Sequence, residues 1–210
     1  MKFILPLKKI FSSSRRTYYS GYYYKILNKY ENVSFFFNLI NIQSARSNVK
    51  TERVIKFNNR LDFNLTQDQV KKIMGKPVLI SYNSEVKMHV IYLYKLRLGD
   101  LKTKAEIHFY NGRMFLGVYL FDRYTWSELQ KVDKVLKEKY STDSASSLTE
   151  SVVIDPLGNS VFIKEDAIYS INYLTGEPSV LDILKIKLEE SISRPYSKRK
   201  RIHDHLGKHL

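Results

Sequence analysis

The pattern of apolar and polar positions along the chain predicts short helices followed by groups of strands. Apolar residues recur at every second position in several segments, and this period indicates β-strands. The segments expected to be strands in the first half are 78–82, 88–98, 104–110 and 114–121. Asn111-Gly112 separates the last two, and both residues tolerate the positive φ angles of a tight turn, so residues 104–121 should form a β-hairpin.

Residues 65–77 predict one short helix with both of its ends specified. Thr66 can cap the first turn, and Gln69 can reach back to complete a capping box. Gly75 can take the left-handed conformation after the last turn, and Pro77 prevents continuation. A helix this short is not stable alone in water, so we expect it to pack on the strands that follow.

A second helix and a second group of strands follow. Thr125 and Glu128 form another capping box, and apolar residues then recur at helical spacing up to Tyr140. The next strands are expected at 152–154, 161–163 and 168–174. Residues 178–191 suit a helix or a strand, and we favour the helix. Because helix-then-strands occurs twice, the core 51–193 is interpreted as two halves, 51–122 and 123–193.

The helix at 65–77 reads Leu-Thr-x-x-x-Val-x-x-x-Met-Gly-x-Pro and precedes antiparallel strands. In this it resembles the SmpA/OmlA-type outer-membrane assembly lipoproteins and the related β-lactamase inhibitor protein fold. The resemblance implies a small α+β binding module, and it carries over no catalytic residue. Those lipoproteins need an acylated cysteine, and this chain has none.

Positive charge is concentrated at the two ends of the chain. Residues 1–50 carry nine Lys or Arg and one acid, for a net charge of +8, and residues 194–210 carry a net +5. The core between them has a net charge of +1. Basic ends of this kind attract polyanions such as nucleic acid, ribosomes or anionic lipid. Residues 43–50 read as a polar linker between the first end and the core.

The basic ends supply the candidate contact residues for a polyanion. Cations could hold phosphates while aromatic rings stack on unpaired bases, or the rings could lie at a membrane interface. The alternative is that these rings pack on the core. The polyanion candidates are Arg15, Arg16, Lys25, Lys198, Arg199, Lys200 and Arg201, and the aromatic candidates are Tyr18, Tyr19, Tyr22, Tyr23 and Tyr24.

The chain has no cysteine, and no apolar run is long enough for a transmembrane helix. Its first apolar run, Phe3–Leu7, is too short for a secretory signal. A mitochondrial-type presequence stays open because the first 30 residues are basic and contain serines. We therefore expect a cytoplasmic protein, with peripheral membrane attachment as the alternative.

No group of residues specifies a reaction. Glu106 and His108 point to one face of a strand and could form an acid–base pair, but no nucleophile accompanies them. We interpret His89 and His108 as half-buried sheet residues. The segment Asp155–Asn159 is explained by a tight turn. Terminal His203, Asp204, His205 and His209 could bind a metal only weakly, so no metal or cofactor is expected.

The expected fold is α+β, an antiparallel sheet with short helices packed on one face. The first functional hypothesis is a non-catalytic module that binds or scaffolds a protein partner. The second is a nucleic-acid-associated protein that uses the basic ends. An enzyme of unknown reaction is the third. A homodimer through the edge of the Asn111-Gly112 hairpin is a further option.

Overall fold

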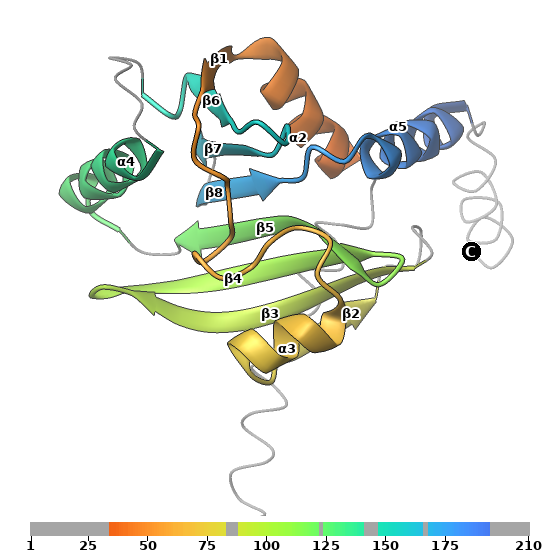
Figure 1. The fold of residues 1–210 in the computed structure, drawn as a ribbon, viewed down its shortest axis with the longest axis horizontal. Helices are drawn as coiled ribbons and strands as arrows, with labels where there is room; N and C mark the ends of the chain where they lie inside the picture. The colour runs from red at the N-terminus through yellow and green to blue at the C-terminus, as the bar shows by residue number, and fades with distance from the viewer. Residues whose placement is uncertain (1–33, 83–87, 122–123, 141–146, 166–167, 194–210) are drawn as a thin grey trace, which may run out of the picture.

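A computed structural model describes residues 34–82, 88–121, 124–140, 147–165 and 168–193. It confirms the α+β class, because short helices surround a single eight-stranded, mostly antiparallel sheet (Figure 1). The strands are β1 (Ser47–Lys50), β2 (Leu79–Tyr82), β3 (His89–Leu98), β4 (Leu101–Tyr110), β5 (Arg113–Phe121), β6 (Ser151–Ile154), β7 (Ser160–Glu165) and β8 (Tyr169–Leu174).

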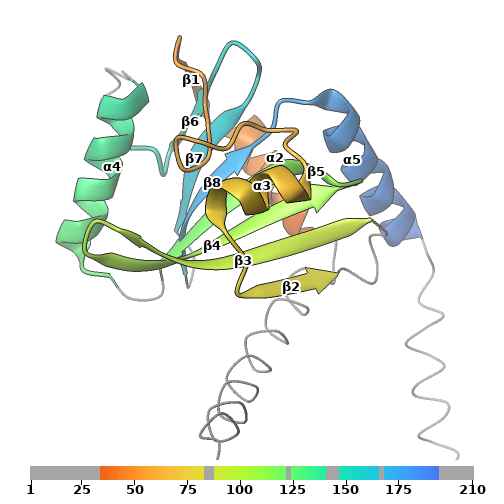
Figure 2. The same ribbon diagram turned by 60° about the horizontal axis from the view of Figure 1, so that its bottom comes forward.

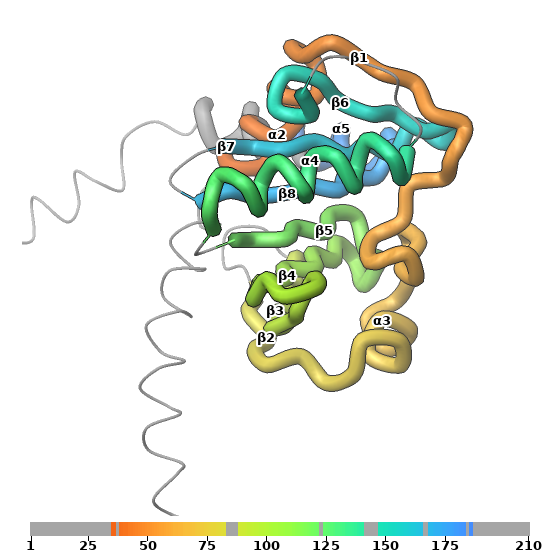
Figure 3. The backbone as a smooth tube through the Cα atoms, turned by 90° about the vertical axis from the view of Figure 1, so that its left-hand side faces the viewer, coloured from red at the N-terminus to blue at the C-terminus, as the bar shows by residue number. Residues whose placement is uncertain are grey.

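Within the sheet, the strands of each predicted group lie next to one another. The spatial order of the strands is β1-β6-β7-β8-β5-β4-β3-β2, which Figure 3 shows from top to bottom. Strands β2–β5 of the first half are contiguous, and so are β6–β8 of the second half. The halves join where β5 pairs with β8 in antiparallel orientation, with Tyr119 opposite Ile171. Only β1, which runs parallel to β6, departs from the antiparallel pattern of the described strands.

Helices pack on both faces of the sheet, and not on one face as expected. The described helices are α2 (Ser34–Ala45), α3 (Gln67–Met74), α4 (Trp126–Tyr140) and α5 (Pro178–Ser193). Buried residues of α3 and α4 belong to one hydrophobic cluster, and those of α2 and α5 to the other.

Strand β3 contributes apolar side chains to both faces of the sheet. Val90, Tyr92 and Tyr94 join the cluster beneath α3 and α4. The alternate residues Ile91 and Leu93 join the cluster beneath α2 and α5. A strand covered on both sides must be apolar at nearly every position, so its alternation is only partial.

Helix α3 has the predicted capping box. The Thr66 hydroxyl accepts from the Gln69 amide, and the Gln69 side chain accepts from the Thr66 amide. Gly75 ends the helix with a positive φ of 82°, but its ψ of −171° is extended, so it does not take the left-handed conformation. The Gly75 amide still donates to the carbonyl of Lys71, which satisfies the last turn.

The β4–β5 hairpin forms as predicted, with positive φ at both Asn111 and Gly112. Its strands, however, lie inside the sheet, because β4 also pairs with β3 and β5 also pairs with β8. Among the described strands, the hairpin therefore presents no free edge to a second copy. The edges of the sheet are β1 and β2.

The interpretation of residues 43–50 as a linker was wrong. Helix α2 continues to Ala45, and residues 47–50 form β1. Phe36, Leu39 and Ile40 of α2 are buried in the core. The folded part of the chain thus begins before residue 51. This contribution is non-local, since β1 pairs with β6 about a hundred residues later.

The remaining predicted elements are present. Helix α4 has its capping box, in which the Glu128 carboxylate accepts from the Thr125 amide at 2.6 Å. Residues 178–193 form a helix and not a strand. None of the helices in the described part of the chain is both long and apolar enough to cross a membrane.

Candidate binding site

A cavity of about 530 Å³ lies where the two halves of the sheet meet, between α4 and the tip of the β3–β4 hairpin. Figure 2 shows this hairpin tip next to α4. Strands β5 and β8 form the floor through Tyr119, Ile171 and Tyr173. The turn at Asn58-Asn59 closes one side. This pocket, called the α4–hairpin pocket below, is within the usual size range of small-molecule sites.

Most of the lining of the α4–hairpin pocket is apolar. The α4 wall presents Val132, Val135 and Leu136, and the hairpin wall presents Leu98 and Leu101. Val135 is 59% exposed, so part of this apolar wall faces solvent. The pocket is therefore suited to an apolar ligand.

The aromatic floor is held rigidly by the segment that precedes α3. The Phe57 ring stacks on Tyr119 with centroids 4.3 Å apart, and its edge meets Tyr173 at 5.4 Å. Gly117 gives Phe57 the room it needs, because a Cβ atom there would lie 2.4 Å from the Phe57 ring. Burial raises the pKa of Tyr119 and of Tyr173, so both floor hydroxyls stay neutral.

Lys139 is the cation that faces this floor. It lines the pocket from the last turn of α4, and its ammonium lies 4.7 Å from the Tyr140 ring centroid and 5.8 Å from that of Tyr173. Burial lowers the pKa of Lys139 from 10.5 to about 8. Among the residues that the structure describes, no carboxylate forms an ion pair with it. Lys139 thus brings to a largely apolar cavity a positive charge that lies against aromatic rings and has no ion pair among the described residues.

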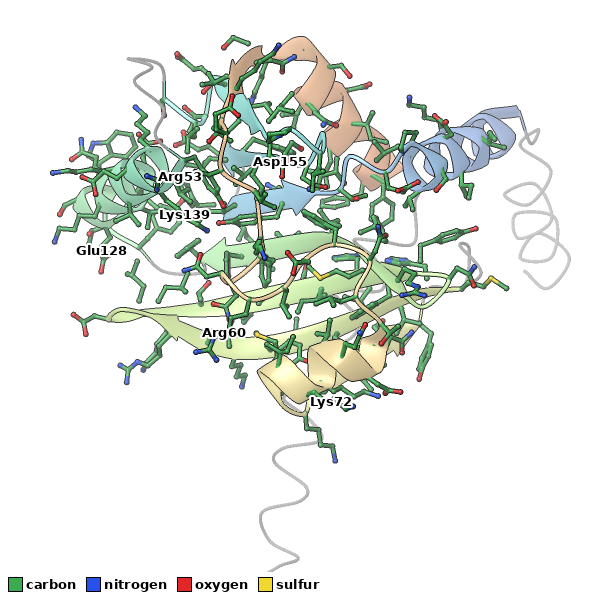
Figure 4. All side chains as sticks on the ribbon, viewed as in Figure 1. Arg53, Arg60, Lys72, Glu128, Lys139 and Asp155 are labelled. Atoms are coloured by element: carbon green, nitrogen blue, oxygen red, sulfur yellow. The ribbon has the colours of Figure 1, made fainter. Side chains whose placement is uncertain are left out.

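The opposite end of the pocket is different, because its charges offset each other. Glu128 and Lys131 both line it, and the Lys131 charge helps to lower the pKa of Glu128, although hydrogen bonds from Thr125 are the larger cause. Figure 4 shows Glu128 and Lys139 towards opposite ends of α4. Asp100 also lines the pocket from the hairpin tip, so the lining holds two acids and two lysines, and Lys139 is the lysine that lies against the aromatic floor.

The predicted pair Glu106 and His108 does lie on one face of β4. The His108 Nε2 atom is 3.9 Å from a Glu106 carboxylate oxygen, and His108 Nδ1 is 3.0 Å from Nε2 of His89. The expectation of half-buried histidines was wrong, because His89 and His108 are 2% and 0% exposed. The cause is α2, since Phe36 packs edge-on against both imidazoles. These groups lie on the face opposite the α4–hairpin pocket.

Asp155 is a structural residue, as the turn interpretation predicted. Its carboxylate accepts hydrogen bonds from the amides of Ile55, Leu157 and Asn159 at 2.8–2.9 Å. The Asn159 side chain donates a fourth bond at 3.0 Å. The carboxylate therefore joins the β6–β7 turn to the segment before α3.

A smaller cavity of about 290 Å³ lies among the loops around residues 54–64, 157–159 and 175–178. Its carboxylates already have partners: Asp62 pairs with Lys56 at 2.8 Å, and Glu177 accepts from Ser179. Among the described residues, no group of three or more His, Asp or Glu is placed to hold a metal ion. The α4–hairpin pocket is the stronger candidate.

The sequence-based candidates for polyanion contact lie outside the described residues, in 1–33 and 194–210, as do the terminal histidines. Lys139 was missed, but the sequence does contain its signal. It follows Val132 by seven residues and Leu136 by three, which places it on the apolar stripe of the helix.

Comparison with protein-family models, curated proteins and solved structures finds no match to this chain.

Proposed function

We propose that the protein is a non-catalytic binding module whose site is the α4–hairpin pocket. The ligand that we propose is an apolar group that carries a carboxylate. The single observation behind this proposal is Lys139, a cation without a described counter-ion at one end of a mostly apolar cavity. A bound carboxylate would supply the missing negative charge, while its apolar body would cover Val135 and the aromatic floor.

Two kinds of ligand share this chemistry. One is a small amphiphile such as a fatty acid, and the other is the C-terminal residue of a partner protein. The second is the protein-binding role expected from the sequence, and the resemblance of residues 65–77 to the SmpA/OmlA-type module supports it. A cytoplasmic location belongs to the same proposal.

Calorimetric titration of the full chain with decanoate and with decanol tests the site. Decanoate should bind more tightly than decanol, because only the acid can pair with Lys139. A Lys139→Ala variant should lose about 10- to 100-fold in decanoate affinity, the usual value of a charged hydrogen bond. Its matched control is Lys134→Ala, which removes an exposed lysine of the same helix and should bind as the wild type does.

A second titration, with peptides, distinguishes the small amphiphile from the protein C-terminus. A pentapeptide that ends in Phe-Leu with a free carboxylate is compared with its C-terminal amide. Preference for the free peptide over decanoate would assign the pocket to a protein C-terminus, and the reverse order would assign it to a small amphiphile. If Lys139→Ala and Lys134→Ala bind every ligand as the wild type does, the proposed site is wrong.

The charge distribution of the sequence supports a second candidate function, association with nucleic acid through the two basic ends. The ends carry +8 and +5 while the core carries +1, so a polyanion would be attracted mainly by the ends. The candidate contacts are the seven cations and five tyrosines named in the sequence analysis.

A further inference from the structure

Lys139 differs from its neighbouring lysines on α4 in its surroundings. Lys134 is exposed and lies 3.9 Å from Glu138, and Lys137 pairs with Asp133 at 3.2 Å. Lys139 lies against the rings of Tyr140 and Tyr173, and it lines the α4–hairpin pocket, whose floor includes Tyr173. Burial of Lys139 therefore disfavours its ammonium form.

Burial has a chemical consequence for this amine. With a pKa of about 8, several per cent of Lys139 carries a free lone pair at neutral pH, far more than a lysine with the ordinary value of 10.5. A neutral amine in a desolvated pocket is a nucleophile towards carbonyl carbon. Reaction also requires that a carbonyl compound be held beside the amine, and the α4–hairpin pocket, which Lys139 lines, provides the space for it.

The lining limits which carbonyl compound fits. Leu98, Val132, Leu136 and Ile171 surround the cavity with aliphatic groups, and Tyr119 and Tyr173 form its floor. An aldehyde with an extended apolar chain matches these walls.

We propose that Lys139 captures an apolar aldehyde in the α4–hairpin pocket as an imine. This inference rests on the proposed function, because it needs the pocket to be a ligand site. The amine lone pair attacks the carbonyl carbon to give a carbinolamine. One amine proton moves to the carbonyl oxygen, which becomes the hydroxyl group of the carbinolamine. The carbinolamine then loses this hydroxyl group and its one remaining N–H proton as water, which leaves the C=N bond. No oxidant or reductant is needed, and hydrolysis reverses the step.

The test traps the imine in the full chain. Protein is incubated with decanal and sodium cyanoborohydride near neutral pH, so that hydride reduces any imine to a stable decyl amine, and modified lysines are mapped by peptide mass spectrometry. Lys139 should be modified at least about tenfold faster than Lys134, because more of it is unprotonated. Excess decanoate should slow modification of Lys139 and leave that of Lys134 unchanged.

A Lys139→Arg variant separates this inference from the proposed function. Arginine keeps the positive charge, so the variant should still prefer decanoate to decanol, but it cannot form the imine. If Lys139 and Lys134 are modified at the same rate in a chain that binds decanoate, the proposed capture of an aldehyde by Lys139 is wrong, while the proposed carboxylate site stands. Selective modification of Lys139 in a chain that does not bind decanoate would support the carbonyl site and overturn the proposed carboxylate ligand.

Discussion

His89 shows what burial does to a single residue in this fold. Its imidazole is buried between the sheet and α2, with His108 at 3.0 Å and the Glu106–His108 pair beyond it. Burial lowers the pKa of His89 well below 6.5, and the like charge of His108 lowers it further. The neutral form is therefore the one that the folded protein keeps.

A pH dependence of stability follows. Below its ordinary pKa of 6.5, His89 binds a proton in the unfolded chain but not in the folded protein. The contribution of His89 to the free energy of unfolding should be constant above that pH. It should decrease as the pH falls below 6.5 and level off below the folded pKa. Urea unfolding of the wild type and of His89→Phe at several pH values checks this. A difference between the two proteins that does not change with pH would contradict it.

Glu106, His108 and Lys139 show which properties of a single residue can be predicted from the sequence and which cannot. The two-residue period of a strand is sufficient to put Glu106 and His108 on one face. Their depth is not a property of the strand, because Phe36 covers them from a helix some seventy residues earlier. Lys139 is similar: its helical position is readable from sequence, but the pocket beside it depends on the distant hairpin tip and Asn58-Asn59 turn.

Elements with local signals were predicted and the elements without them were not. Helix α3 and the β4–β5 hairpin are specified by caps and turn residues next to them in the chain. Helix α2 has apolar residues around much of its circumference and no charged residue in its first or last turn, so the sequence gives no amphipathic pattern. Strand β1 is four residues long, and only its distant pairing with β6 makes it a strand.

A substitution in α2 tests whether this helix belongs to the core. Leu39 is 1% exposed in the cluster that covers Ile91 and Val118, so Leu39→Ala should lower the free energy of unfolding by about 2–5 kcal/mol. The control, Asn38→Ala, changes an exposed residue of the same helix and should stay within about 0.5 kcal/mol of the wild type. Urea unfolding measures both. Equal stability of the two variants would mean that α2 does not contribute to the core.

At the scale of the whole molecule, the fold separates two possible modes of binding. The α4–hairpin pocket belongs to the nearly neutral core and is formed by both halves of the sheet. The excess positive charge belongs to the ends of the sequence. Substitutions at the ends should therefore leave decanoate binding unchanged, while substitutions at Lys139 should leave any polyanion binding unchanged.

Salt dependence provides the test of the ends. We expect the full chain to bind a single-stranded oligonucleotide with an affinity that falls steeply with salt. Replacing Lys198, Arg199, Lys200 and Arg201 by Gln should reduce the slope of log affinity against log salt by up to about 3, since each phosphate contact contributes about 0.7. The control replaces four exposed core cations, Lys72, Lys76, Arg97 and Lys102. It removes the same net charge, so an equal loss in both variants would show that total charge, and not the C-terminal cluster, governs binding. Fluorescence anisotropy at several salt concentrations measures both slopes.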